Sequence, residues 1–306
     1  MKNQADIQYK HIIETINRVG VWDKDQDVRT VWADGTPAYT KSWIGQSMVF
    51  DNTEVPILTT KYVAWKSAIK ELLWIWQMKS NVVQDLRDMG VNIWNEWELQ
   101  DGTIGKAYGY QLGKRGKNKT RIFPVEKAKL ELLDPKYGYQ DIHNSVKYIY
   151  LDQVDYLIQN LISNPNSRRH TTTLNNPDET GAMSLIACVH GTQWHVKNDY
   201  LHLEVRARSN DMPLGNPFNI FQYNVLQRMI AQVTGYKLGN FIFSIGDAHY
   251  YERHEEKILE QINREFYDTP TLWINPEVKS FYDFTIDDFK LENYKYGDKI
   301  SYEIAI

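Results

Sequence analysis

Two stretches of the chain place apolar residues at the spacing of an α-helix. The first runs from Tyr62 to Lys79, and the second runs from about Pro217 to Tyr236. The second has a proline near its start and Gly235 near its end, the usual arrangement at helix termini. We expect two helices with inward faces that carry Val63, Ile69, Leu72, Leu73 and Trp76 in the first, and Leu226, Met229, Ile230 and Val233 in the second.

Three other stretches alternate apolar and polar residues, which is the two-residue period of a strand with one buried face. Their apolar positions are Leu201, Leu203, Val205 and Ala207; then Phe241, Phe243 and Ile245; and, at the end of the chain, Ile300, Tyr302, Ile304 and Ile306. Strands and helices are mixed along the chain without a regular alternation. We therefore expect an α+β fold, with a mixed β-sheet covered by helices.

One stretch, from Lys114 to Asp152, differs from the rest in composition. It contains Pro124, Pro135 and Gly138, and it opens with the basic residues Lys114, Arg115, Lys117, Lys119 and Arg121. A basic run of this kind is usually a solvated face rather than a nucleic-acid site. Because no repeat or Gly/Ser linker divides the chain, we expect one domain over residues 1–306, with residues 114–152 as a surface insertion.

Length, aromatic content and net charge limit the kinds of protein that this chain can be. The 306 residues suffice for one large core or two small ones, and the 10 Trp, 20 Tyr and 10 Phe suit both packing and the stacking of a heterocycle. A net charge of −4 gives no general attraction to nucleic acid, so we expect no DNA partner and find no support for RNA binding.

The sequence also indicates a compartment. No apolar run follows the first residues as it would in a signal peptide, and no apolar window approaches the ~18 residues that span a bilayer. The single cysteine excludes an internal disulfide and fits a reducing environment. We expect a cytoplasmic protein without a membrane anchor.

Two common kinds of site are disfavoured by spacing. The pairs His190/His195 and His249/His254 are five residues apart, so they do not stack on one helical face as zinc ligands would. We expect no metal. No glycine-rich phosphate loop precedes a helix either.

An anion site is suggested where a polar strand face meets a helix start. Arg206 to Asp211 end an alternating strand, and Gly215 to Asn219 open the following helix. A helix N-terminus beside arginines is a natural phosphate site, although a surface ion-pair cluster remains the alternative. The neighbours Arg168 and Arg169 point apart on a strand, so both reach one anion only if the chain bends or a second subunit takes part.

Cys188 is the only thiol of the chain. A lone cysteine is often just a small buried apolar residue. Near guanidinium groups its pKa would instead fall, and the thiolate nucleophile would be populated near neutral pH. Residue types alone leave both interpretations open.

The ordered motifs resemble the thymidylate synthase family. Arg206-Ala-Arg-Ser-Asn-Asp211 through Gly215-Asn-Pro-Phe-Asn219 is similar to its phosphate and pyrimidine segment, and Ile245 to Tyr251 is similar to its sugar-binding segment. Further matches in the family's order are Asp27-Val-Arg29-Thr, Thr59-Thr-Lys61, Glu71-Leu-Leu-Trp74, Ser167-Arg-Arg169 and the ending Ile304-Ala-Ile306. The resemblance covers most of the chain outside residues 114–152.

This resemblance implies an activity and a dimer. The reaction is the reductive methylation of dUMP to dTMP, with methylenetetrahydrofolate supplying both carbon and hydride. The implied fold packs sheets across the interface of an obligate homodimer. Cys188 would add to carbon 6 of uracil, Arg208 would touch both the thiolate and the phosphate, and Glu71 would transfer protons through water with the aid of Tyr108.

The resemblance also implies how dUMP is bound. Arg29 and Ser209 would bind the phosphate from the same subunit, and Arg168 and Arg169 would reach it from the partner. His249 and Tyr251 would bond the deoxyribose hydroxyl. Asn219 would accept from the ring N–H of uracil and donate to the neighbouring oxygen, which favours dUMP over dCMP. A helix-start asparagine that only caps is the alternative for Asn219.

For the folate, the resemblance implies a second group of residues. Asp211 would anchor the pterin, Trp94 and Trp97 would wall the pocket, Lys61 would meet the acidic tail, and Ile306 would end a lid that excludes water. For Trp94, Trp97 and Glu71, plain core packing or a buried ion pair is the alternative.

Three positions depart from the family pattern. Asn175 stands where the family usually has Trp, and Ala187 and Val189 stand where it usually has Pro and His beside the cysteine. We expect an altered rate or pocket shape rather than lost activity.

The departures keep rival functions open. Water instead of hydride could quench the methylene intermediate, which would make the protein a dUMP hydroxymethylase. A non-catalytic nucleotide- or RNA-binding homologue is a second rival. A Cys–His hydrolase that uses His190 or His249 is disfavoured, because no orienting acid sits at a recognisable position.

Overall fold

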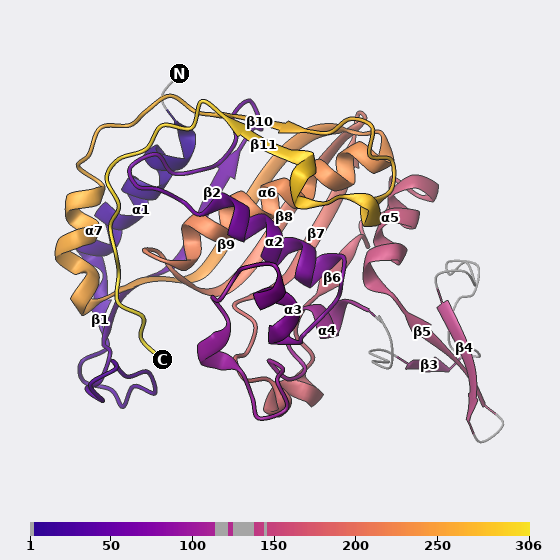
Figure 1. Cartoon of the computed structure of the whole chain (residues 1–306), viewed down its shortest axis with the longest axis horizontal. Helices are drawn as coiled ribbons and strands as arrows, with labels where there is room; N and C mark the ends of the chain where they lie inside the picture. The colour runs from indigo at the N-terminus through magenta and orange to yellow at the C-terminus, as the bar shows by residue number, and fades with distance from the viewer. Residues whose placement is uncertain (1–2, 114–121, 125–137, 144–145) are drawn as a thin grey trace.

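The computed structural model describes residues 3–113, 122–124, 138–143 and 146–306, and its centre is a mixed six-stranded β-sheet (Figure 1). The strand order is β1 (Val21–Trp22), β2 (Thr40–Phe50), β9 (Lys237–Tyr251), β8 (Tyr200–Asp211), β7 (Val189–Lys197) and β6 (Thr171–Thr173). Neighbouring strands are antiparallel except β8 and β9, which pair in parallel. The expected α+β fold is confirmed.

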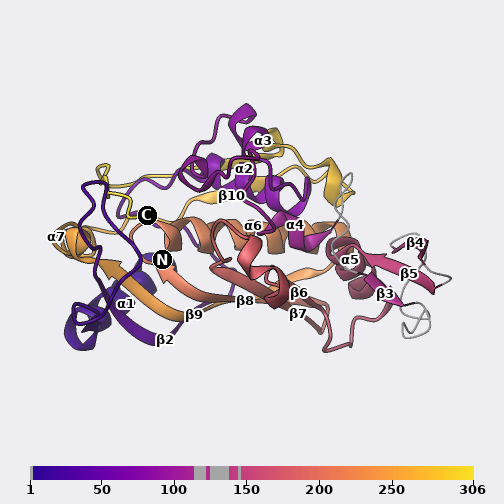
Figure 2. The same cartoon turned by 90° about the horizontal axis from the view of Figure 1, so that it is seen from below.

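Helices cover one face of this sheet (Figure 2). The parallel pair β8 and β9 needs a crossover, and α6 (Gly215–Thr234) supplies it. Helix α2 (Trp65–Trp76) packs on α6 on the same side of the sheet. The remaining helices of the described part of the chain are α1 (Gln4–Val19), α3 (Val83–Asp88), α4 (Gly109–Leu112), α5 (Gln153–Ser163) and α7 (Glu255–Gln261), with short 3-10 turns between elements.

The two helices expected from periodicity are both present. Helix α2 is shorter than the pattern that predicted it, and its residues Ile69, Leu72 and Trp76 are buried. Helix α6 ends at Gly235, which takes the left-handed conformation (φ +78°) and donates its N–H to carbonyls of the last turn. Buried residues lie all round α6, because the sheet is on one side of it and α2 is on the other.

The predicted alternation of β8 and β9 is confirmed. Leu201, Leu203 and Val205 are fully buried beneath α6, whereas Arg206 on the same strand is exposed. The opposite face of β7, β8 and β9 carries no helix of the described part of the chain in the view of Figure 2. Trp43, Ile44 and Val49 of the neighbouring β2 are exposed.

The strand expected for the last seven residues is wrong. Residues 300–306 form no strand, and the side chains of Ile304 and Ile306 are 48% and 45% exposed, against 8% for Tyr302. The alternating pattern has no sheet edge beside it. Among the described residues, only Ile306 of this segment makes backbone-to-backbone hydrogen bonds with another strand or loop, exchanging two with Val31.

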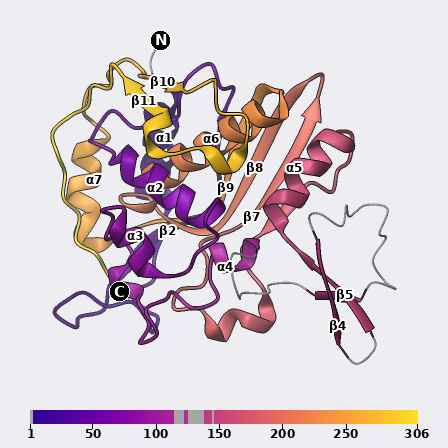
Figure 3. The same ribbon diagram turned by 45° about the vertical axis from the view of Figure 1, so that its right-hand side comes forward.

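Two further small sheets lie outside the main one. Strands β10 (Thr271–Ile274) and β11 (Phe289–Glu292) form a pair, and β3 (Ile122–Pro124), β5 (Val146–Leu151) and β4 (Gly138–His143) form a sheet in that order (Figure 3). The second belongs to the predicted insertion. The basic residues that open it, Lys114, Arg115, Lys117, Lys119 and Arg121, lie outside the described residues.

Candidate active site

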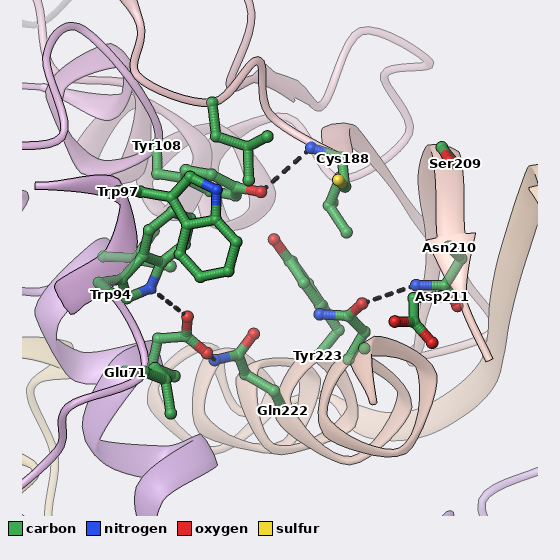
Figure 4. Close-up of a pocket in the computed structure, with 16 residues that line it drawn as sticks. Glu71, Trp94, Trp97, Tyr108, Cys188, Ser209, Asn210, Asp211, Gln222 and Tyr223 are labelled. Atoms are coloured by element: carbon green, nitrogen blue, oxygen red, sulfur yellow. Dashed lines mark hydrogen bonds between the residues drawn. The ribbon is translucent and has the colours of Figure 1, made fainter. Parts of the chain in front are cut away.

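A cavity of about 200 Å3 opens between α2, the start of α6 and the end of β8 (Figure 4). Eight of the residues singled out from the sequence line it. They are Glu71, Trp94, Trp97, Tyr108, Cys188, Ser209, Asp211 and Asn219. These residues come from segments that are far apart in the sequence, so the fold brings together side chains that the resemblance grouped only by role.

Cys188 sits directly before β7, on the cavity wall, and is held by contacts on two sides. Its backbone N–H donates to the hydroxyl of Tyr108 (3.1 Å). Arg208 places Nη2 3.9 Å from Sγ of Cys188 and also donates to the backbone oxygens of Ile186 (2.7 Å) and Ala187 (3.2 Å). The guanidinium therefore braces the loop that presents the sulfur, besides lying beside the sulfur itself.

Of the two interpretations left open for Cys188, the one with a lowered pKa does not hold in the structure as it stands. Burial raises the pKa of the thiol, and this effect outweighs the lowering by Arg208 and Tyr108. The thiol is therefore less ionised than an exposed one at neutral pH. The sequence could reveal the guanidinium nearby but not the burial that opposes it.

Tyr108 occupies an unusual backbone conformation next to the cavity. Its φ is +46°, a region that a residue with a large side chain adopts at a cost, and helix α4 begins directly after it. The hydroxyl is buried, and burial raises its pKa well above the ordinary value. Tyr108 therefore stays protonated and offers a neutral hydroxyl beside Cys188.

Glu71 of α2 is a buried carboxyl with two donors. Its Oε1 accepts from the indole N–H of Trp94 (2.7 Å), and its Oε2 accepts from the side-chain amide of Gln222 (2.8 Å). Burial raises the pKa of Glu71, although both donors act in the opposite direction. A carboxyl with a raised pKa changes charge closer to neutral pH, which suits proton transfer.

An aromatic wall forms one side of the cavity (Figure 4). The ring of Trp94 meets Trp97 edge to face at 5.6 Å and Tyr108 at 5.2 Å between centroids. Trp94 is buried, while Trp97 is only partly covered. Because its N–H is bonded to Glu71, Trp94 is fixed in orientation and presents a flat surface to the cavity.

The polar side of the cavity comes from the end of β8 and the start of α6. Asn219 accepts from the side-chain amide of Asn210 (2.9 Å), which leaves its own N–H groups available to the cavity. Asp211 accepts from the backbone N–H of Leu214 (3.1 Å), so one of its oxygens shapes the turn between strand and helix. Ser209 lines the cavity between these residues and Cys188.

His249 and Tyr251 come from the end of β9, and His249 lies next to Ser209. Nδ1 of His249 is 3.5 Å from the hydroxyl of Ser209 and 3.4 Å from a carboxylate oxygen of Asp247. Burial lowers the pKa of His249, but Asp247 and Asp211 outweigh it, so the net shift is upward. Burial raises the pKa of Tyr251 to about 12. The rings of His249 and Tyr251 meet edge to face at 5.6 Å.

The other predicted site residues lie outside the cavity lining. Arg29, Arg168 and Arg169 are exposed. Lys61 is buried, donates to the backbone oxygen of Pro213, and has its ammonium 4.9 Å from the ring centre of Tyr302, so it does not reach the cavity here. Burial lowers the pKa of Lys61 to about 8. Ile306 lies against the loop that follows β1.

Several lining residues were not predicted as site residues, although Val189, Asn210 and Gly215 stand in stretches that the sequence analysis singled out. They are Ile75, Ile93, Leu185, Val189, Asn210, Gly215, Gln222 and Tyr223. Gln222 and Tyr223 follow Asn219 by three and four residues, which is the spacing of one helix face, so this signal was present in the sequence. Val189, one of the departures from the family pattern, places an apolar side chain at the cavity.

Two general properties complete the description. No helix in the described part of the chain is both long and apolar enough to cross a bilayer. Among the same residues, no group of three or more His, Cys, Asp and Glu side chains is arranged to hold a metal ion.

Comparison with known proteins agrees with this geometry. The family model described as thymidylate synthase matches residues 7–306. The chain belongs to the thymidylate synthase family. Thymidylate synthase 1 of Bacillus subtilis strain 168 is 60% identical over 304 residues, covering 99% of each protein, and the thymidylate synthase of Bacillus phage phi3T is 58% identical over the same length and coverage.

A solved structure extends the agreement to the fold. The thermostable thymidylate synthase A from Bacillus subtilis matches with a TM-score of 0.86 at 59% identity, covering 98% of this chain and 99% of that one. The enzyme is a methyltransferase that converts dUMP to dTMP with methylenetetrahydrofolate as co-substrate. The family and activity expected from the motifs are thereby confirmed.

Proposed function

We propose that the cavity is the active site and that Cys188 is its nucleophile. The sulfur adds to carbon 6 of the pyrimidine, which makes carbon 5 nucleophilic toward the folate's one-carbon unit. The observation that carries this proposal is the position of Sγ, on the cavity wall and 3.9 Å from Nη2 of Arg208. At this position the guanidinium of Arg208 would lie next to the thiolate of Cys188 or to a phosphate of the substrate.

Proton transfer falls to Glu71 and Tyr108 in this proposal. Both lie on the cavity, both are buried, and Glu71 has the raised pKa that suits a group which gains and loses a proton. Asn219 reads the pyrimidine edge opposite them. Its N–H groups donate to a uracil oxygen, and its own oxygen, which already accepts from Asn210, has a second lone pair for the ring N–H.

We assign the phosphate and the sugar of dUMP to the residues beyond Cys188. Arg208, Ser209 and Arg29 bind the phosphate within one subunit, and His249 with Tyr251 bonds the deoxyribose. The contact between Ser209 and His249 supports a continuous path from phosphate to sugar. Arg168 and Arg169 complete the phosphate site from the partner subunit.

The folate is assigned to the aromatic side of the cavity. Trp94 and Trp97 offer flat faces on which rings can stack, and Asp211 offers a carboxylate for the pterin. Ile306 closes the site, and Lys61 meets the folate's acidic tail. The contact by Lys61 requires its ammonium to leave the carbonyl of Pro213.

We further propose that the active enzyme is an obligate homodimer. The face of β7, β8 and β9 without helices supports sheet-to-sheet packing between two copies, as does Val49, which is exposed on β2 between the buried Met48 and Phe50. The exposure of Arg168 and Arg169, away from their own cavity, supports their action in the partner's site.

The chain as a whole is proposed to be one catalytic domain over residues 1–306, with a variable surface insertion at about 114–152. The single family match over residues 7–306 supports this division. We propose a cytoplasmic location on the support of the lone cysteine, which fits a reducing compartment.

Replacement of the nucleophile tests the proposal. Cys188→Ser is expected to abolish turnover while retaining dUMP binding, because the arginines and Asn219 remain. Wild-type enzyme given dUMP and methylenetetrahydrofolate should form dihydrofolate as dUMP is consumed. Consumption of dUMP without dihydrofolate would indicate hydroxymethylation, and full turnover by Cys188→Ser would remove Cys188 from the mechanism.

A further inference from the structure

We propose that Arg253 is a positioning residue that ties the loop carrying Arg29 to the C-terminal segment ending at Ile306. The inference rests on the proposed function, since it concerns two segments assigned there to the phosphate and the folate. Figures 1 and 3 both place the C-terminus beside the loop that follows β1.

The guanidinium of Arg253 reaches both segments at once. Nη2 donates to a carboxylate oxygen of Asp34 (2.7 Å) and to the hydroxyl of Thr36 (2.9 Å), which belong to the loop. Nη1 donates to both carboxylate oxygens of Glu303 (3.1 and 3.2 Å), in the C-terminal segment. The guanidinium also lies 4.7 Å from the ring centre of Trp32. One planar side chain thus bridges two segments and stacks on a third group.

The backbone joins the same two segments a short distance away. The N–H of Val31 donates to the oxygen of Ile306 (2.8 Å), and the N–H of Ile306 donates to the oxygen of Val31 (2.9 Å). Within the loop, the N–H of Ala38 donates to the oxygen of Thr30 (2.9 Å), so Val31 belongs to a closed hairpin. A displacement of this hairpin therefore moves the partner of Ile306.

Other contacts hold the C-terminal segment to the body of the enzyme. His254, next to Arg253, is 2.8 Å from the backbone oxygen of Glu303 through Nε2. The hydroxyl of Tyr302 donates to Gln261 of α7 (2.7 Å), and Nζ of Lys257 donates to the oxygen of Ser301 (2.9 Å). These bonds fix residues 301–303, and the ring of His254 also meets Trp32 of the loop edge to face at 5.6 Å between centroids. Among the described residues, the hydrogen-bonded side-chain link between loop and segment is supplied by Arg253.

The position of Arg253 in the chain connects this link to the proposed active site. Arg253 follows Tyr251 by two residues, and Val31 follows Arg29 by two residues. Arg253 therefore fixes the loop and the C-terminus relative to the end of β9, from which His249 and Tyr251 arise. Loss of the link should loosen the substrate contacts of Arg29 and Ile306 and leave the surroundings of Cys188 unchanged.

The test replaces Arg253 and measures directly how firmly the loop and the C-terminal segment are held together. In Arg253→Gln, hydrogen exchange at the amides of Val31 and Ile306 in the ligand-free enzyme should speed up by about tenfold. The KM for methylenetetrahydrofolate should rise by about fivefold to tenfold, with kcat changed by less than about twofold. Arg253→Lys keeps the positive charge but not the planar guanidinium that donates to two segments at once. Its exchange rates and KM should therefore lie between those of wild type and Arg253→Gln.

A double variant and a control complete the design. The double variant Arg253→Gln/Glu303→Gln should show nearly the same exchange rates and KM as Arg253→Gln, because both substitutions remove the same contact. Lys10→Gln removes a partly exposed charge that pairs with Glu14 at 3.8 Å on α1, and it should change neither readout. Unchanged exchange in Arg253→Gln, or faster exchange with an unchanged KM, would overturn the inference. The exchange measurement needs no turnover, so it is separate from any failure of the proposed function.

Discussion

The backbone N–H of Cys188 donates to the hydroxyl of Tyr108, although eighty residues separate the two in the chain. The bond fixes the loop that presents the sulfur to a tyrosine whose own backbone is strained, with φ at +46°. It also uses the tyrosine oxygen as an acceptor, while the hydroxyl hydrogen can bond the side chain of Cys188, a contact that lowers the pKa of the thiol. Tyr108 therefore has two roles: it holds the loop that presents Cys188, and it places a proton donor beside the nucleophile.

Removal of this hydroxyl should damage the chemistry more than the fold. Tyr108→Phe is expected to lower kcat by about 100-fold and stability by about 1–3 kcal/mol, since the Cys188 N–H loses its acceptor. Steady-state kinetics and urea denaturation measure the two effects. Tyr110→Phe is the control, because Tyr110 lies outside the cavity lining. Equal losses in both variants would show that Tyr108 has no special role.

The raised pKa of Glu71 predicts a pH dependence with a definite sign. Between the ordinary value of 4.5 and the raised folded value, the folded state binds more protons than the unfolded state. The free energy of unfolding of wild type, relative to Glu71→Gln, should therefore fall as pH rises through this window. Denaturation of both proteins over that range measures the difference. A difference that grows with pH would contradict the burial-driven shift.

Glu71→Gln should also alter the pH profile of the reaction. The wild-type profile of kcat/KM is expected to have a limb with its midpoint above 4.5, and this limb should vanish in the variant. The remaining activity should be low, because an amide does not gain and lose a proton as a carboxyl does, and its NH2 end cannot accept from Trp94 or Gln222. Retention of the limb would assign it to another group.

The raised pKa of Cys188 predicts slow alkylation at neutral pH. Only the thiolate reacts with iodoacetamide, so the rate in the ligand-free enzyme should still be rising with pH above about pH 8. Arg208→Gln should shift the profile further upward, because the guanidinium lowers the pKa of the thiol. Cys188→Ser should not be labelled, since the chain has one cysteine. A rate independent of pH between about 6 and 8 would mean that the thiol is already ionised.

Mixing of inactive subunits tests whether the arginines act across a dimer. Cys188→Ser and the double variant Arg168→Ala/Arg169→Ala should each be nearly inactive alone. After subunit exchange, half the dimers are mixed, and each mixed dimer has one site with an intact cysteine and intact partner arginines. Activity should recover to roughly one quarter of wild type. If the arginines act within their own subunit, or the enzyme is monomeric, mixing restores nothing.

Much of the fold could be predicted because the relevant signals are local. The periodicity of Leu226, Met229 and Ile230 predicts the face of α6, and the alternation of Leu201 to Ala207 predicts the buried face of β8. Alternation alone does not make a strand at the C-terminus. Residues 300–306 lack a neighbouring sheet edge, which is a property of the whole fold.

The site was predictable by residue type but not by environment. The motifs identified Cys188 and Arg208, whereas the balance between burial and charge at the sulfur depends on packing that no local pattern reveals. Its spacing from Asn219 places Gln222 on the cavity face of α6, but its contact with Glu71 forms only when α2 and α6 pack together. The same holds for the meeting of Arg253 with Asp34 and Glu303.

The most direct test is a crystal structure of the enzyme with dUMP and a folate analogue, and the measurement is the distance from Sγ of Cys188 to carbon 6 of the pyrimidine. The account predicts a covalent bond or an approach of about 3–3.5 Å, with the phosphate on Arg208. A pyrimidine bound elsewhere, with Sγ too far from carbon 6 to react, would contradict it.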